Sequence, residues 1–400
     1  MTETKTIKYM TLTLVALSAT FYYGAYALGT VLFFILYLKQ GSSLRGILLQ
    51  EKSFIFMAAA LLLSTVFSKT LAYSLLIDGL ILIHMMVYIV IVRTINKENI
   101  DQVLQMLNML GIIICLYGGY QYFTGDLTVD SSWTDTKTFG SLIRIYSTLR
   151  NPNILAAYLT FNICYAGAYF IKKKADIYTA VNIMLSSICL ILTYSRGGFF
   201  AFVAAMLVLT VLCRDAKTAA YTAVMILLYF GYNYYESINR IDFGMLVADS
   251  SSQYRVEIWK ASFELFKENM AFGSGPGSVM QLLSYSSDKL KGFISHAHNI
   301  EIHLLAETGV LGLTTFGGMV VSGMVKAFRF YRIHKNHEDS FVAIGFVAAM
   351  TAMLVHGLVD CAVFVPSRSL VFLIYLSLFP AVYYSLHEKH SGKVTSGLGC

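Results

Sequence analysis

The densest group of polar side chains in this sequence is the segment from Ser295 to Gly309, which places His296, His298 and His303 among apolar neighbours. An imidazole titrates near neutral pH, so a histidine here could act as a general base on a hydroxyl group. An interfacial histidine that only hydrogen-bonds a carbonyl is the alternative. Because the segment lacks HExxH and other zinc-ligand spacings, we expect no metal ion.

A second group consists of arginines that fall near the ends of apolar runs. Arg196 precedes Gly197 and Gly198, and Arg150 stands at the head of another run. A guanidinium group stays charged and makes paired hydrogen bonds, which suits it to phosphate oxygens. Snorkelling to lipid headgroups is the competing interpretation.

One histidine and one carboxylate lie near the end of a late apolar run. His356 and Asp360 are one helical turn apart if the helix continues, so the carboxylate could orient or charge the imidazole. Ionisable groups in such runs are costly and usually face a cavity. We therefore include both residues in the candidate site.

The elements that must hold these residues are membrane helices. Hydrophobic residues make up 56% of the 400 residues and charged residues only 13%, far from the soluble average of about a quarter charged. Reading the sequence by hydropathy gives about twelve apolar runs. They are 10–21, 25–38, 53–67, 71–92, 103–122, 154–171, 177–193, 199–213, 218–234, 308–325, 341–358 and 370–386.

The charges between the runs predict an orientation. Lysine and arginine clusters fall on one side together with Lys5 and Lys8, which places both termini in the cytoplasm by the positive-inside rule. Two long segments, 123–153 and 235–307, then lie outside the cytoplasm in a single transmembrane domain spanning 1–400. The second segment contains an amphipathic helix, followed by a tight turn at Gly273 to Gly277. The expected apolar face of that helix consists of Val256, Trp259, Phe263, Phe266 and Met270.

The remaining composition excludes several classes of function. The net charge of +7 is spread over short segments between runs, so we expect no nucleic-acid partner. The six cysteines form no CxxC pair. Phosphate-loop, nucleotide-sugar and nucleophile-elbow motifs are absent. An enzyme on the outer face without nucleotide or metal needs an activated substrate, and a lipid pyrophosphate is one.

Motifs between about residues 145 and 365 resemble, in their order, the bacterial O-antigen ligase and polysaccharide polymerase superfamily. The matching segments are Arg150-Asn151-Pro152-Asn153, Ser195-Arg196-Gly197-Gly198, Tyr254-Arg255 with Ile258-Trp259, Gly273 to Gly277, and His296-Ala297-His298-Asn299 leading to Glu307-Thr308-Gly309. Phe200 departs from the pattern, because an aliphatic residue more often occupies its place.

The resemblance implies an all-α polytopic membrane protein, a GT-C-like bundle of about twelve transmembrane helices with a large extracytoplasmic loop. It also implies a transferase of the bacterial cytoplasmic membrane that uses no cofactor or metal. The donor would be an undecaprenyl-pyrophosphate-linked glycan, and the acceptor a glycolipid or growing glycan. In this likeness His298 is the base, and Arg196 and Arg255 bind the pyrophosphate with help from Arg150 and His296. Asn299, Tyr254, His356 and Asp360 support them.

Three other functions remain open at this point. The same motifs fit a polymerase that adds repeat units, which the sequence does not separate from a ligase. A transporter or flippase for lipid-linked sugars would also have about twelve spans, but it predicts internal repeats and polar sites at the midplane. A non-catalytic partner in envelope assembly would use the large loop for docking.

Overall fold

The computed structural model describes residues 52–125, 143–173, 176–235, 250–290, 292–364 and 369–395. Within these ranges the chain forms twelve α-helices, two short 3₁₀ helices and no β-strand. The α-helices are α4 (Lys52–Val66), α5 (Leu71–Thr94), α6 (Ile100–Thr124), α8 (Pro152–Lys173), α9 (Ile177–Leu192), α10 (Arg196–Cys213), α11 (Ala216–Tyr235), α13 (Ser250–Glu268), α14 (Ser278–Leu283), α15 (Ile300–His334), α16 (Ser340–Gly357) and α17 (Ser369–Thr395). The 3₁₀ helices are η2 (Ser147–Leu149) and η3 (Ala362–Phe364).

The apolar runs predicted from the sequence correspond to helices wherever the structure describes them. Ten runs coincide with α4 to α6, α8 to α11 and α15 to α17, whereas 10–21 and 25–38 lie outside the described residues. Seven described helices are long and apolar enough to cross a membrane, and α4 and α9 are shorter apolar helices. The prediction of an all-α membrane protein is thus supported, with seven candidate spans in the described residues.

Helices α8 and α16 form the centre of the bundle. In each of them, 83% of the most apolar 18-residue stretch is buried. Helix α16 packs against α8, α10 and α15. Close approach is possible because α16 carries small residues on its buried faces. At Gly345, for example, a Cβ atom would lie 2.6 Å from the ring of Tyr165. The small side chains therefore let the backbones of these helices approach closely.

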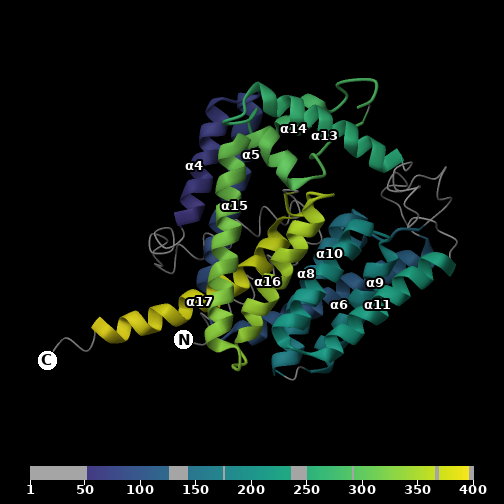
Figure 1. Ribbon diagram of the computed structural model, residues 1–400, viewed down its shortest axis with the longest axis vertical. Helices are drawn as coiled ribbons and strands as arrows, with labels where there is room; N and C mark the ends of the chain where they lie inside the picture. The colour runs from purple at the N-terminus through teal and green to yellow at the C-terminus, as the bar shows by residue number, and fades with distance from the viewer. Residues whose placement is uncertain are drawn as a thin grey trace.

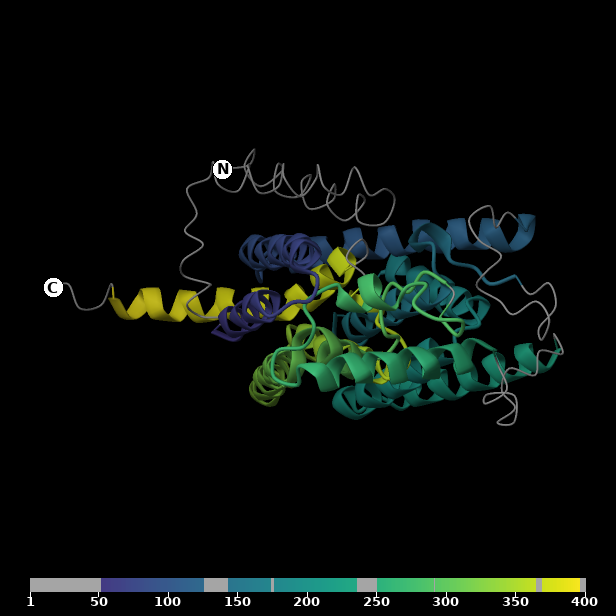
Figure 2. The same ribbon diagram turned by 90° about the horizontal axis from the view of Figure 1, so that it is seen from above.

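A second group of helices lies beside this centre. Helix α15 packs on α4 as well as on α16, and α17 packs on α5. Figure 1 shows α4, α5 and α15 on one side and α6, α9 and α11 on the other. The view from above in Figure 2 shows the C-terminal part of α17 projecting beyond the other helices.

Helix α13 lies crosswise at one end of the bundle and packs against α15 (Figure 1). The predicted amphipathic helix is confirmed, but its predicted apolar face is partly wrong. Ile258 and Leu265 are buried, whereas Val256 and Phe263 are 40% and 43% exposed. The face of the helix that packs on the bundle is therefore centred on Ile258. It is shifted by one residue from the predicted face, which includes Trp259.

The turn after α13 is bonded to a break in α15. Gly309 has φ 65° and ψ −165° inside α15. Around this break, the N–H groups of Val310 and Leu311 donate to the carbonyls of Met270 and Ala271. The predicted tight turn is confirmed, because three of its glycines have positive φ angles. The turn thus supplies hydrogen bonds that the broken helix cannot make internally.

Candidate active site

The site forms where several helix ends meet. Helices α8 and α10 begin there, α16 has just ended, and the segment before α15 passes alongside. The helix starts have side-chain caps, since Ser195 accepts from the N–H of Gly198 and Asn299 from that of Ile302. Such caps fix where a helix begins. They therefore also fix the positions of the polar residues just before each helix.

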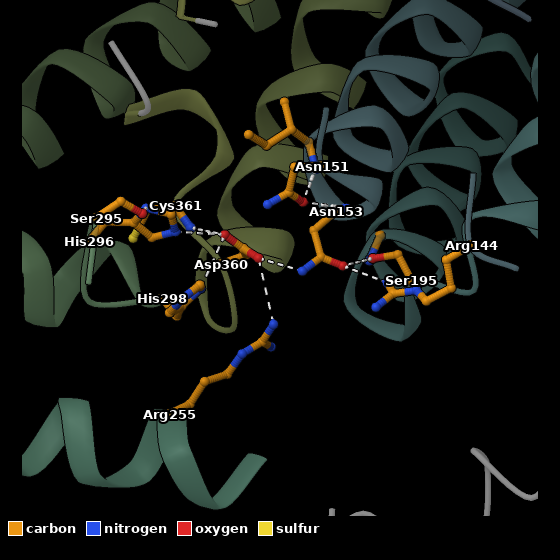
Figure 3. Close-up of polar contacts among 12 residues, drawn as sticks. Arg144, Asn151, Asn153, Ser195, Arg255, Ser295, His296, His298, Asp360 and Cys361 are labelled. Carbon is orange, nitrogen blue, oxygen red and sulfur yellow. Dashed lines mark hydrogen bonds and ion pairs between the residues drawn. The ribbon is translucent and has the colours of Figure 1, made fainter. Parts of the chain in front are cut away.

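Asp360 is the centre of the site (Figure 3). Its Oδ1 atom lies 3.1 Å from His296 Nε2 and 3.5 Å from His298 Nδ1. Its Oδ2 atom accepts a 2.8 Å hydrogen bond from Asn153 Nδ2 and lies 3.7 Å from the Arg255 guanidinium. Four side chains from three segments thus converge on one buried carboxylate.

The surroundings of Asp360 favour its ionised form. Burial by itself would raise the pKa of Asp360, but the charges and hydrogen bonds of His298 and His296 hold that pKa well below its usual range. Burial, followed by the neighbouring charge of His298, lowers the pKa of His296. At neutral pH, therefore, Asp360 is a carboxylate and His296 is uncharged.

The two histidines differ in what their rings can still do. Both ring nitrogens of His296 are engaged, Nδ1 with Ser295 Oγ at 2.8 Å and Nε2 with Asp360. His298 directs Nδ1 toward Asp360, its side chain is 22% exposed, and its backbone φ is 53°. That φ value is uncommon for a residue other than glycine and is often found at functional sites. Of the two rings, that of His298 is the more accessible, since the His296 side chain is only 6% exposed.

Hydrogen bonds among residues at the starts of α8 and α10, together with Arg144, hold Asp360 in place. Asn153 Oδ1 accepts hydrogen bonds from Ser195 Oγ at 2.9 Å and from the Arg144 guanidinium at 3.1 Å. Arg144 in turn donates from Nε to the carbonyl of Thr193 at 2.9 Å. The amide of Asn153 therefore joins the start of α10 to the carboxylate of Asp360.

The remaining predicted residues lie around this cluster rather than in it. Arg196 follows Ser195 as the first residue of α10, and Arg150 ends η2 with φ 56°, three residues before Asn153. Asn299 caps α15 and donates to the carbonyl of Leu358. Tyr254 packs against the small hydrophobic core under α13.

His356 and Asp360 are one helical turn apart, as predicted, because the N–H of Asp360 donates to the carbonyl of His356 across 2.9 Å. The Asp360 carboxylate contacts His296 and His298. His356 packs against Gly197, where a Cβ atom would lie 3.2 Å from the imidazole Cδ2. Gly197 is therefore a place of close packing between α10 and α16.

Sequence reasoning missed the roles of Asn153, Ser195 and Arg144. All three are close to motifs that the sequence does display, but an amide and a hydroxyl give no signal of their own. The sequence did predict that His303 and Glu307 share a helix face, and in the structure their side chains lie 3.6 Å apart. Their i, i+4 spacing was the available signal.

One part of the site has the donors to hold a cation. The ligand atoms of His296, His298 and Asp360 lie within 4.8 Å of one another. Two imidazoles and a carboxylate are ligands that zinc accepts. In the structure these same atoms face each other, as a hydrogen-bonded pair of His296 and Asp360 with His298 alongside.

Residues 181–317 match the family model described as O-antigen ligase. This segment is similar to the O-antigen ligase family. It covers α9 to the first half of α15 and therefore includes Arg196, Arg255, His296 and His298. Asn153 and Asp360 lie outside the matched segment, on either side of it, yet Asp360 contacts Asn153 and residues within the segment. No curated protein matches the sequence.

Proposed function

We propose that the protein transfers a glycan from an undecaprenyl-pyrophosphate donor to an acceptor hydroxyl, outside the cytoplasm of a bacterium. The observation that carries this proposal is the contact of His296, His298 and Arg255 with Asp360 in a chain with an O-antigen ligase segment. We place the protein in the cytoplasmic membrane with both termini inside. The site and segments 123–153 and 235–307 then face outward.

In this mechanism His298 is the general base. Its Nδ1–H points to Asp360, and its Nε2 takes the proton from the acceptor hydroxyl. The oxygen attacks the anomeric carbon of the donor with inversion, and the bond from that carbon to the pyrophosphate breaks. The electron pair of that bond leaves with the lipid pyrophosphate. Asp360 fixes the tautomer of His298 and stabilises the imidazolium that forms, as a carboxylate does in a catalytic triad.

The arginines stabilise the leaving group. Arg255 and Arg196 bind the pyrophosphate, with Arg150 and His296 assisting, while negative charge develops on its oxygens. Fixed donors of this kind act strongly where water is excluded, and the loss of one typically costs about 10²–10³ in rate. Support for Arg255 comes from its ion pair with Asp360, which holds the guanidinium beside the base.

The same chemistry fits two members of the superfamily. A ligase moves a finished glycan to a different acceptor, and a polymerase extends a lipid-linked chain. We favour the ligase because the matched family model carries that description. The acceptor decides between the two, so the experiment must supply it separately.

The test is reconstitution of the full-length protein in liposomes with a lipid-pyrophosphate-linked repeat unit. Products are read by gel and mass spectrometry, with and without an added glycolipid acceptor. Transfer only with the acceptor supports the ligase, and a ladder of longer donor-linked chains supports the polymerase. No product in either case, from a folded protein, would contradict glycan transfer and favour a transporter.

Two matched controls make the result specific. His298→Ala should abolish transfer, whereas His337→Ala, at the opposite end of the bundle, should leave it unchanged. Arg255→Lys keeps the charge but loses the paired donors, and we expect a fall of about 10–100-fold, the worth of hydrogen bonds to a charged group. Because the mechanism uses no metal, the rate should also be unchanged by a chelator. A loss that zinc restores would assign the cluster of His296, His298 and Asp360 to metal binding.

A further inference from the structure

A large apolar cavity lies beside the site and reaches His296. Its volume is about 400 Å³, and it is enclosed by α4, α5, α15, α16 and α17. Side chains such as Met57, Phe316, Met350 and Leu373 line it. At one end it reaches Ser295, His296 and His303, and at the other end Lys326 and Tyr384.

The length and volume of this cavity fit a single hydrocarbon chain. His303 and Lys326 are 23 residues apart on α15, which corresponds to about 34 Å at a helical rise of about 1.5 Å per residue. That length matches the hydrocarbon core of a bilayer, about 30 Å. Since a cavity of about 150 Å³ holds one benzene molecule, this one accommodates on the order of 16 carbon atoms. That is an ordinary acyl or alkyl chain and only a small part of a long polyprenyl chain.

The polar end of the cavity carries negative rather than positive charge. Both carboxylate oxygens of Glu307 accept backbone hydrogen bonds, Oε2 from Gly277 at 2.9 Å and Oε1 from Val279 at 3.2 Å. Within the described part of the chain, Lys326 at the far end is the one lysine or arginine in its lining. A pyrophosphate group is therefore disfavoured beside Glu307.

His303 provides a hydrogen-bond acceptor at this end. Its Nε2 lies 3.6 Å from Glu307 Oε2, which orients the ring with its N–H toward the carboxylate. Its Nδ1 is buried, and it has no hydrogen-bond partner among the residues that the structure describes; the residue as a whole is only 8% exposed. A buried acceptor without a partner is costly. A hydroxyl group in the cavity would satisfy it.

We propose that this cavity binds the hydrocarbon chain of a single-chain amphiphile whose uncharged, hydroxyl-bearing head donates a hydrogen bond to His303 Nδ1. This amphiphile is the acceptor lipid, an assignment that rests on the proposed function. Its head then lies beside His296, which shares Asp360 with the base His298. Donor and acceptor would occupy opposite sides of Asp360, the donor on the side of Arg255 and the acceptor on the side of Glu307.

The experiment uses the full-length protein in phospholipid nanodiscs and an alkyl glucoside with a diazirine in its chain. After irradiation, labelled peptides are located by mass spectrometry. We expect labels on α15, α16 and α17, displaced by unlabelled alkyl glucoside but not by alkyl phosphate or polyprenyl pyrophosphate. Labelling that polyprenyl pyrophosphate displaces, or labelling spread evenly over the lipid-facing helices, would overturn the proposal.

Variants separate the chain site from the head site. Met350→Trp fills the cavity and should reduce labelling at least tenfold, whereas Leu207→Trp, on an exposed part of α10, should not. His303→Phe should weaken displacement by the glucoside, and His303→Asn, which keeps an acceptor, should restore part of it. In the transfer assay, Met350→Trp should raise KM for the acceptor and leave KM for the donor unchanged. Labelling of the cavity without any transfer would leave the lipid site standing and contradict only the proposed function.

Discussion

Asn153 donates a hydrogen bond from Nδ2 to Asp360 Oδ2 across 2.8 Å, although 207 residues separate the two in the sequence. The opposite end of the same amide accepts from Ser195 and Arg144. These partners determine which way the amide points, because only the nitrogen can donate. Asp360 is thereby held with its other oxygen toward the histidines.

Asn153→Asp should therefore lower the transfer rate strongly, although the two side chains are nearly equal in size. It replaces a donor by a second carboxylate beside Asp360, and like charges at this distance raise the pKa of one of the pair. We expect a fall in transfer rate of about 10²-fold or more, the typical cost of one lost catalytic donor, with partial recovery at lower pH. The check is a pH–rate profile of the variant. An Asn153→Asp protein with the wild-type profile would show that the amide bond is unimportant.

Asp360→Asn should remove most of the activity without preventing folding. The amide has nearly the same shape, but it cannot act as the ionised acceptor for both histidines and Arg255. By comparison with the aspartate of a catalytic triad, we expect a loss of about 10⁴ in turnover. The measurement is single-turnover transfer at matched membrane level. Asp339→Asn, a buried aspartate bonded to Lys97 at the opposite end of the bundle, serves as control and should retain turnover.

Stability should decrease as the solution is acidified below pH 6.5. Because burial lowers the pKa of His296 in the folded protein, the unfolded chain binds a proton more readily in this range. The contribution of His296 is fully present above pH 6.5 and is lost as the pH falls toward its folded pKa. Asp360 adds a second loss below about its ordinary value of 3.8. Thermal unfolding of wild type and His296→Asn across pH 5 to 7.5 measures the first effect, and equal slopes for both proteins would exclude it.

Gly309→Ala should destabilise the protein, whereas Gly317→Ala on the same helix should not. At Gly309 the backbone φ is 65° and a Cβ atom would lie 2.5 Å from the backbone of Ala271. Backbone strain alone costs about 1–3 kcal/mol. At Gly317 no atom of the described residues lies within 4 Å of the added Cβ, so alanine there should stabilise by about 0.5–1 kcal/mol. The Tm of both variants gives the comparison, and a Tm drop of the same size in each would contradict it.

The helices were the most predictable part of the structure. Each apolar run is long and uniform, and a membrane helix satisfies its own backbone hydrogen bonds, so local sequence determines it. The break in α15 was not foreseen, because the partners of Gly309 come from residues 270–272, far away in the sequence. The apolar face of α13 was misplaced for a similar reason, since its burial depends on α15.

The sequence predicted which residues form most of the site, but not which of them contact one another. His296, His298, Arg255 and Asp360 stood out as rare charged or imidazole groups in an apolar chain. The helical spacing correctly placed Asp360 one turn after His356, as their backbone hydrogen bond shows. The contact of Asp360 with His296, 64 residues away, had no signal in the sequence because the two segments meet only in the folded bundle. The sequence did not predict that the Asn153 amide hydrogen-bonds both Asp360 and Ser195 at the start of α10, because an uncharged amide has no distinctive pattern.

The position of Asp360 near the end of the chain also bears on how the protein is made. Asn153 leaves the ribosome 207 residues earlier, which corresponds to about 10–40 s at about 5–20 residues per second. During this interval Asn153, then Arg255 and then His298 enter the nascent chain without the carboxylate that joins them. The site is thus complete only when the last two helices, α16 and α17, are being made. A chain cut short before residue 360 could enter the membrane and still be inert.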